Sequence, residues 1–162
     1  MIKIAKAEEK HIPAIKELWL EFIKFHADAD DTISPGEEFF QKGLASCAGF
    51  EKDFLRPNLT AENSLVLVAI DDEKTVGYAV AVITPTINAT VKDTGNIDHV
   101  AVAAEYRRHE IGRLLYDEIL KWFHTRGITV VQVMVLARNG IAGAFWHKLG
   151  YRDYQYNLIK KI

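Results

Sequence analysis

The segment from Val100 to Tyr116 carries the residues best suited to bind an anion. It joins a strand-like start, a basic turn and the first turn of an amphipathic helix, and backbone N–H groups at a helix N-terminus bind phosphate oxygens. Gly112 lets an anion approach the backbone closely, and Arg107, Arg108 and Arg113 add local positive charge. These residues predict an anion-binding cradle. They also fit an ordinary helix start with its arginines in water, so residue types alone leave both interpretations open.

The cradle lacks the marks of the two common nucleotide-binding loops. Gly112 is not followed by the Lys-Ser/Thr pair of a Walker loop, and no Gly-x-Gly-x-x-Gly fingerprint is present. Metal binding is also disfavoured, because the chain has a single cysteine, Cys47, and no pair of histidines at the i, i+4 spacing. The sequence therefore predicts no metal site.

Composition excludes several classes of protein. The chain has 162 residues, of which 49% are hydrophobic and 26% charged, as expected for one globular domain. A formal charge of −2 gives no overall positive field, so nucleic acid is not expected as a partner. The single cysteine fits a reducing compartment. No signal core and no run of about 18 apolar residues is present, so we expect no membrane contact and a cytoplasmic location.

Hydrophobic periodicity places the cradle within a series of strands and helices. Predicted strands cover Ile2 to Ala5, Leu65 to Ile70, Thr75 to Ile83, Ile97 to Val102 and Val130 to Leu136, with a last strand within Tyr154 to Ile162. Predicted helices run from Ile12 to about His26, within Glu37 to Phe54, from Ile111 to Phe123 and from Asn139 to Leu149, and Gly127 and Gly150 end the last two.

The order of these elements indicates the fold class. The second and third strands form an antiparallel hairpin, and the later strands alternate with helices. Val130 to Leu136 is apolar enough for a strand covered on both faces. We therefore predict a single domain, residues 1–162, of mixed α/β class, with a sheet that is antiparallel early and parallel late and has helices on both faces.

Two motifs in this framework resemble those of the GCN5-related N-acetyltransferase (GNAT) family. The family has Gln/Arg-x-x-Gly-x-Gly/Ala at a helix start after a strand, and Arg107, Ile111 and Gly112 match that signature. Downstream, the sequence NGIAGAFWHKLGY, which begins at Asn139, is similar to the family's Asn-x-x-Ala-x-x-Phe-Tyr-x-Lys-x-Gly-Phe. The motifs stand in the family's order and spacing, and the resemblance covers nearly the whole chain.

The resemblance implies a mixed sheet of about six or seven strands that splays between the strand at Ile97 to Val102 and the strand at Val130 to Leu136. Acetyl-coenzyme A would lie in that splay and give its acetyl group directly to a primary amine, without a covalent enzyme intermediate. The cofactor-binding residues that the resemblance implies are a strand edge, the cradle and one asparagine: Val100, Ala101, Val102, Arg107, Arg108, His109, Glu110, Ile111, Gly112, Arg113 and Asn139.

The chain departs from the family at two positions. Glu110 stands where the family usually has the first glycine of its loop, and a carboxylate there would repel a pyrophosphate. Trp146 stands where many relatives carry a tyrosine that protonates the leaving thiolate, which an indole cannot do at neutral pH. Tyr151, Tyr154 and Tyr156 are the alternative proton donors nearby in sequence.

In this family a carboxylate or histidine on the strand before the loop often helps the amine to lose its proton. Asp98 and His99 are the ionisable groups there, and alternation along a regular strand places them on opposite faces unless a bulge intervenes. We expect Asp98 or His99 to be the catalytic base, with Asp98 slightly favoured. A solvated carboxylate and a packed imidazole are the ordinary alternatives for these two side chains.

The function that we expect is N-acetylation, from acetyl-coenzyme A, of a primary amine on an unidentified small molecule or peptide. The alternative is a non-catalytic acyl-coenzyme A-binding or regulatory domain of the same fold, which Glu110 and Trp146 favour. The sequence leaves the oligomeric state open between monomer and homodimer.

Overall fold

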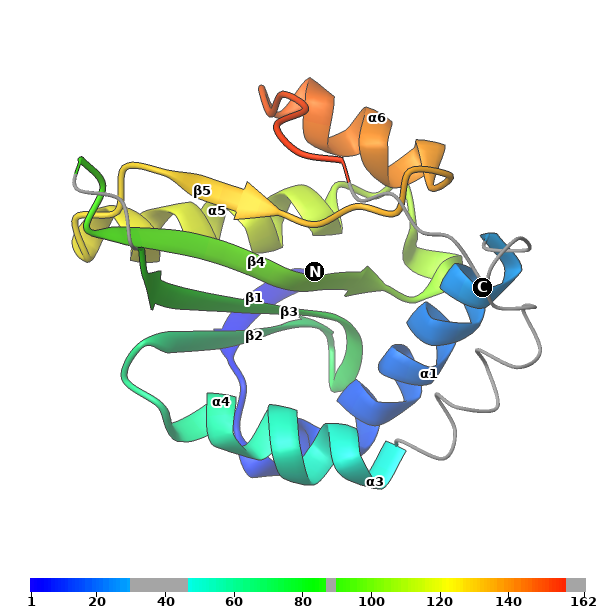
Figure 1. The fold of residues 1–162 in the computed structure, drawn as a ribbon. Helices are drawn as coiled ribbons and strands as arrows, with labels where there is room; N and C mark the ends of the chain where they lie inside the picture. The colour runs from blue at the N-terminus through cyan, green and yellow to red at the C-terminus, as the bar shows by residue number, and fades with distance from the viewer. Residues whose placement is uncertain (30–46, 87–89, 157–162) are drawn as a thin grey trace.

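A five-stranded sheet forms the centre of the computed structural model, which describes residues 1–29, 47–86 and 90–156 (Figure 1). The strands lie side by side in chain order: β1 (Ile2–Lys6), β2 (Ser64–Asp71), β3 (Lys74–Pro85), β4 (Asp93–Val102) and β5 (Val131–Val133). The first three pairings are antiparallel, and β4 pairs with β5 in parallel. The predicted hairpin and the mixed sheet are confirmed.

Helices cover both faces of the sheet, as predicted. In chain order the helical elements are η1 (Glu9–His11), α1 (Ile12–Ala29), α3 (Cys47–Gly49), η2 (Phe50–Leu55), α4 (Arg56–Thr60), η3 (Ala104–Tyr106), α5 (Ile111–Thr125) and α6 (Gly140–Lys148). The π-helical η2 joins α3 to α4 without a break. Alternate residues of β2 enter two cores: Val66 and Val68 pack toward α1 and η2, whereas Leu67 packs toward α5.

Glycines end both helices of the second core, as the sequence predicts. Gly127 follows α5 with φ +71° and Gly150 follows α6 with φ +92°, a backbone conformation that glycine adopts without a steric penalty. The first helix is longer than predicted: α1 continues to Ala29 instead of ending near His26.

The segment from Val130 to Leu136 corrects one prediction. The strand β5 is only three residues long, and the segment is covered on one face rather than two. Val131, Val133 and Val135 pack on the α5 side, whereas Met134 is 88% exposed. The prediction was wrong because a run of apolar residues does not reveal whether a second layer lies over the strand.

The sheet has five strands among the described residues, fewer than the six or seven expected. Residues 154–156 form no strand, and the rest of the predicted last strand, residues 157–162, lies outside the described residues. The predicted helical stretch from Glu37 to Phe54 is confirmed from Cys47 onward, and residues 37–46 likewise lie outside them.

The contact between Gly95 and Phe123 fixes how closely α5 packs on β4. A Cβ atom at Gly95 would lie 2.7 Å from the Phe123 ring, closer than two carbon atoms pack. The ring has no room to move, since Phe123 is 1% exposed in the core. A side chain at position 95 would therefore push helix and strand apart.

We expect Gly95→Ala to lower the free energy of unfolding by about 1–3 kcal/mol, the usual cost of overpacking a core. Urea unfolding followed by circular dichroism measures the change. Gly143→Ala is the matched control, because a Cβ at this position in α6 meets nothing within 4 Å and alanine favours a helix. An unfolding midpoint for Gly95→Ala at or above that of the parent protein would contradict the packing argument.

Candidate functional site

The site begins where β4 and β5 part. Backbone pairing between them is limited to Gly95 with Val131, Asn96 with Gln132 and Ile97 with Val133, although β4 runs on to Val102. The second half of β4 therefore has β3 on one edge and no paired strand on the other among the described residues. This is the splay that the family resemblance implied, and it leaves Val100 to Val102 without a strand partner on this edge, where the Val102 carbonyl accepts a hydrogen bond from Arg107.

The loop after β4 leads into an open helix start. Arg108 and Glu110 both have left-handed backbones, with φ +67° and +60°, and Glu110 is the N-cap of α5. The first helical hydrogen bond runs from the Leu114 N–H to the Glu110 carbonyl, at 3.0 Å. Helix geometry thus leaves the N–H groups of Ile111, Gly112 and Arg113 without an intrahelical acceptor, as an anion cradle requires.

The two family motifs meet at Gly112. A Cβ atom built there would lie 3.6 Å from Cζ of Phe145 in α6, an ordinary contact distance. The downstream motif therefore packs beside the first turn of α5. Any side chain larger than a methyl group at position 112 would have to share the space beside Phe145 or project over the free amides.

Two of the three arginines of the predicted cradle form hydrogen bonds within the protein. Arg107 donates from Nε to the Val102 carbonyl at 3.1 Å and from Nη2 to Glu21 at 2.6 Å, and its guanidinium lies over the Phe25 ring. Arg113 donates to Asp117 at 2.8 Å. Arg107 thus ties the end of β4 to α1, and of the three arginines in the predicted cluster, Arg107 and Arg113 have hydrogen-bond partners within the protein.

Glu110 has a left-handed backbone conformation, which glycine adopts more easily than other residues. Its φ of +60° lies in the left-handed region, where a Cβ atom costs energy, and its side chain makes no capping hydrogen bond. The family's glycine at this position thus has a physical reason that is independent of charge. The carboxylate is exposed, so solvent screens its repulsion toward an anion.

Asn139 caps the helix that carries the second motif. Its Oδ1 accepts a hydrogen bond from the Ala142 N–H at 3.0 Å, and the residue is 7% exposed. The side-chain carbonyl therefore fixes the start of α6. The predicted contact of Asn139 with the cofactor arm stays a prediction.

A β-bulge separates Asp98 from His99. Val80 of β3 pairs with His99 and Ala81 with Ile97, so Asp98 is the extra residue of β4. The Asp98 side chain is exposed, and the protein around it still removes enough water to raise the pKa of its carboxyl above the ordinary value. The bulge places Asp98 directly after the last β4–β5 pair, at the opening of the splay.

His99 lies in an aromatic cluster on the α1 side of the sheet. Its ring centroid is 5.2 Å from that of Phe22, 5.8 Å from Phe50 and 4.9 Å from Phe54. Its Nδ1 lies 3.0 Å from the hydroxyl of Tyr78, which is fully buried on β3. Sequence analysis missed Tyr78, and only the β3–β4 register could have revealed it.

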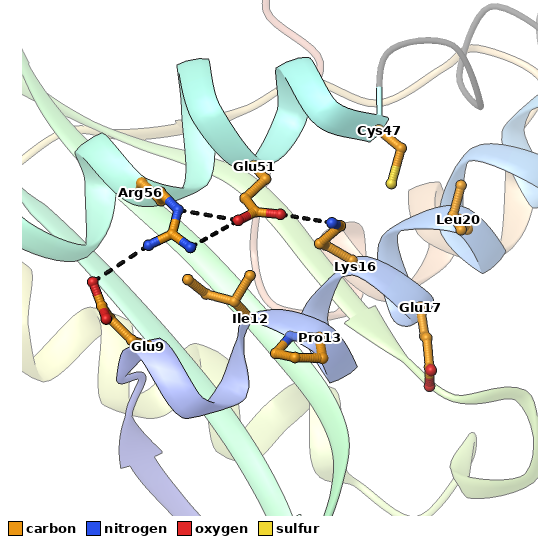
Figure 2. Close-up of a pocket in the computed structure, with 9 residues that line it drawn as sticks. All are labelled: Glu9, Ile12, Pro13, Lys16, Glu17, Leu20, Cys47, Glu51 and Arg56. Carbon is orange, nitrogen blue, oxygen red and sulfur yellow. Dashed lines mark hydrogen bonds and ion pairs between the residues drawn. The ribbon is translucent and has the colours of Figure 1, made fainter.

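A chain of ion pairs holds the helical segment with Phe50 and Phe54 against α1 (Figure 2). Glu51 accepts from Lys16 at 2.6 Å and from Arg56 at 2.8 Å, and Arg56 also reaches Glu9 at 3.3 Å. The groove beside these residues, about 430 Å³, has Ile12, Pro13 and Leu20 on its apolar side and contains no residue of the predicted site.

The residue at the family's tyrosine position belongs to the core. Trp146 is 7% exposed and meets the rings of Tyr116 and Tyr151 edge to face, at 5.9 and 5.3 Å. The Tyr151 hydroxyl is buried, and burial, with a smaller contribution from the nearby Tyr116, raises the pKa of this phenol above its usual value. Tyr154 and Tyr156 are largely exposed, and Tyr156 donates to Asp153.

Neither a metal site nor a membrane-spanning helix is found in the described part of the chain. No three side chains of the His, Cys, Asp and Glu types gather there closely enough to hold a metal ion. None of the helices described is long and apolar enough to cross a membrane.

Comparison with known proteins agrees with this geometry. The family model described as Acetyltransferase (GNAT) family matches residues 17–151. The ribosomal protein bS18-alanine N-acetyltransferase of Salmonella typhimurium is 28% identical over 67 residues, which are 41% of this chain and 45% of that enzyme. The match thus spans less than half the length of this curated relative.

Solved structures are similar over the whole chain. A mutant of the BH1408 protein from Bacillus halodurans superimposes with a TM-score of 0.81 at 22% identity, with 99% of each chain covered. The aminoglycoside N-acetyltransferase AAC(6')-Iy, in complex with CoA, gives a TM-score of 0.68 at 13% identity and covers 100% of this chain and 95% of its own. These likenesses show the fold. Because the family model spans most of the sequence, including the splay, the cradle and α6, this chain belongs to the GNAT acetyltransferase family.

Proposed function

We propose that the protein is an N-acetyltransferase that uses acetyl-coenzyme A and acetylates a primary amine by direct attack. The observation that carries the proposal is the parting of β4 from β5 after Ile97, directly beside a helix start whose first amides are free. An open strand edge and an anion cradle in one place suit a long ligand with a phosphate-bearing end and an amide-bearing arm. The curated relative and the aminoglycoside enzyme both acetylate nitrogen, which supports the same reaction here.

The residues of this chain fit the ligand in two respects. The cradle amides of Ile111, Gly112 and Arg113 follow the exposed Arg108 closely in sequence, which suits a pyrophosphate. The Val100 to Val102 edge suits the peptide-like groups of a pantetheine arm.

Acetyl-coenzyme A supplies the acetyl group as a thioester. The amine nitrogen forms the new C–N bond as the C–S bond breaks, and it gives up one proton while the sulfur gains one.

Asp98 is the group proposed to take the amine proton, directly or through a water molecule. It lies at the opening of the splay, and its raised pKa makes its carboxylate a stronger base than an ordinary aspartate. The family's tyrosine position is occupied by the buried Trp146, and the raised pKa of Tyr151 makes that phenol a weaker acid than usual. The thiolate is therefore proposed to leave without a tyrosine and to take its proton from water.

The acceptor is proposed to be a primary amine of a small molecule or peptide. The curated relative acts on an alanine of a ribosomal protein and one structural neighbour on aminoglycosides, so both acceptor classes belong in the first panel. A cytoplasmic location and a homodimeric state stay predictions.

A non-catalytic acyl-coenzyme A-binding domain is the second candidate, because Glu110 and Trp146 depart from the family at a phosphate position and a proton-donor position. Two measurements separate the candidates. Coenzyme A at about 100 times its dissociation constant stabilises a binding protein by about 2.7 kcal/mol, which thermal unfolding detects. Thiol release from acetyl-coenzyme A with a panel of amines detects turnover, and binding without release from any amine would favour the second candidate.

The cradle assignment predicts that Gly112→Val weakens coenzyme A binding by more than tenfold. The added methyl groups either project over the free amides or displace Phe145. Isothermal titration calorimetry measures the affinity. Gly143→Val, the same change in an α6 position with open space, should leave affinity unchanged, and Gly112→Ala should have a smaller effect than Gly112→Val. Equal affinities for all four proteins would exclude the cradle.

Glu110 generates a prediction in two parts. Glu110→Gly should raise the free energy of unfolding by about 1 kcal/mol, because glycine relieves the left-handed backbone at φ +60°. It should also tighten coenzyme A binding by about three- to a hundredfold, since the carboxylate repulsion is lost. Glu110→Gln separates the two effects, as it removes the charge and keeps the side chain. Weaker binding in both variants would mean that Glu110 contacts the ligand favourably.

The base assignment predicts an acidic limb in the pH dependence of kcat/KM. Because burial raises the pKa of Asp98, activity falls as the pH drops through a value above that of an ordinary aspartate. Asp98→Asn should lower kcat/KM by about 10²- to 10⁴-fold and abolish the limb. Unchanged coenzyme A affinity and circular dichroism control for folding. A limb that persists in Asp98→Asn would assign the base elsewhere.

A further inference from the structure

We propose that Tyr78 is a positioning residue: its hydroxyl donates a hydrogen bond to Nδ1 of His99 and thereby fixes the neutral imidazole with its proton on Nε2. His99 then acts as a hydrogen-bond donor rather than as the catalytic base. The tautomer follows from the fold alone, whereas its part in catalysis rests on the proposed function.

The buried hydroxyl has one hydrogen-bonding neighbour. Tyr78 is 0% exposed, and among the described residues the His99 Nδ1, at 3.0 Å, is the polar atom within hydrogen-bonding distance of its oxygen. A buried O–H that donates to nothing loses the free energy of a hydrogen bond. The hydroxyl therefore donates, and the nitrogen that accepts must lack a proton.

The surroundings keep the phenol protonated. Burial raises the pKa of Tyr78 well above its usual value, so its oxygen carries the proton at every pH at which the enzyme would work. The alternative arrangement, with Nδ1–H donating to the phenol oxygen, would leave the buried phenol proton without an acceptor among the described residues. The direction of the bond is therefore set by Tyr78.

Packing keeps the ring in place. Phe22 from α1 and Phe54 from η2 tilt against the imidazole at centroid distances of 5.2 and 4.9 Å, and Phe50 stacks at 5.8 Å. Turning the ring over would place a C–H group at the Tyr78 hydroxyl and break this hydrogen bond. The ion pair between Glu51 of η2 and Lys16 of α1 helps to hold Phe50 and Phe54 in this arrangement.

The tautomer decides what His99 can do chemically. A neutral imidazole has one lone pair for a proton, and here the Tyr78 hydroxyl occupies it. The Nε2–H group can donate to a carbonyl or amine lone pair but cannot accept the ammonium proton. Proton removal then falls to Asp98, the neighbouring residue at the bulge.

The decisive experiment is NMR on protein labelled with ¹⁵N in the histidine rings, at a pH where a titration shows the ring of His99 to be neutral. Long-range ¹H–¹⁵N correlations distinguish the two tautomers, and His99→Gln assigns the signals. In the parent protein we expect Nε2 to be protonated and Nδ1 to be unprotonated. In Tyr78→Phe we expect a mixture of the two tautomers. Tyr116→Phe, which removes another phenol hydroxyl, should leave the His99 signals unchanged.

The NMR outcomes bear directly on the proposal. A proton on Nδ1 in the parent protein would overturn it, and so would an unchanged tautomer in Tyr78→Phe. The measurement on the parent protein tests the proposal even if Tyr78→Phe fails to fold. It also needs no substrate, so it separates failure of this inference from failure of the proposed acetyl transfer.

Once an acceptor amine is found, kinetics tests the catalytic part. A glutamine amide can donate from near the position of Nε2, so His99→Gln should keep kcat within about tenfold of the parent, whereas His99→Leu should lose a hundredfold or more. A loss in both variants of about 10²-fold or more would identify His99 as a base and overturn the donor role. Full activity in both variants would overturn it as well.

Discussion

The strand β4 is held along its whole length by β3 but by β5 only as far as Ile97, and this difference determines the site. A sheet edge with unpaired N–H and C=O groups is normally paired or covered. Here the open half of β4 leads directly into the loop that starts α5, so strand-edge groups and helix-start amides face the same region. Arg107 fixes that junction, because it bonds the last carbonyl of β4 and Glu21 of α1 together. The cradle is thus a consequence of backbone geometry, and its arginines contribute more to the fold than to its charge.

The other face of β4 is fixed by different forces. The Lys16–Glu51 ion pair between α1 and η2 is partly exposed, so it contributes little free energy, but it helps to fix which ridge of η2 meets the sheet. That ridge presents Phe50 and Phe54 to His99. The imidazole is therefore enclosed by apolar rings on one side and bonded to a buried phenol on the other, and its chemistry depends on both.

Sequence was sufficient for those parts of the protein that local pattern determines. The helix start at Ile111, the glycine turns after α5 and α6, the hairpin and the order of strands and helices all follow from periodicity and turn chemistry. It failed where a third element decides the outcome. Val130 to Leu136 looks like a buried strand, yet only a layer on its outer face could bury Met134, and that layer is not encoded in the segment itself. The link between Tyr78 and His99 likewise depends on a register between two strands that contains a bulge.

The bulge at Asp98 also explains why the alternation of side chains along a regular strand could not decide between Asp98 and His99 as the base. In a regular strand Ile97 and His99 share one face, but here Ile97 packs toward α5 while His99 packs toward α1. The extra residue thus lets β4 present an apolar side chain to one core and an imidazole to the other within three positions. Asp98 lies between them and has no pairing partner on β3. Its side chain is exposed and belongs to neither core. A strand that must border two cores and an open splay needs such an irregularity, and the ionisable group that it carries is the one that we propose as the catalytic base.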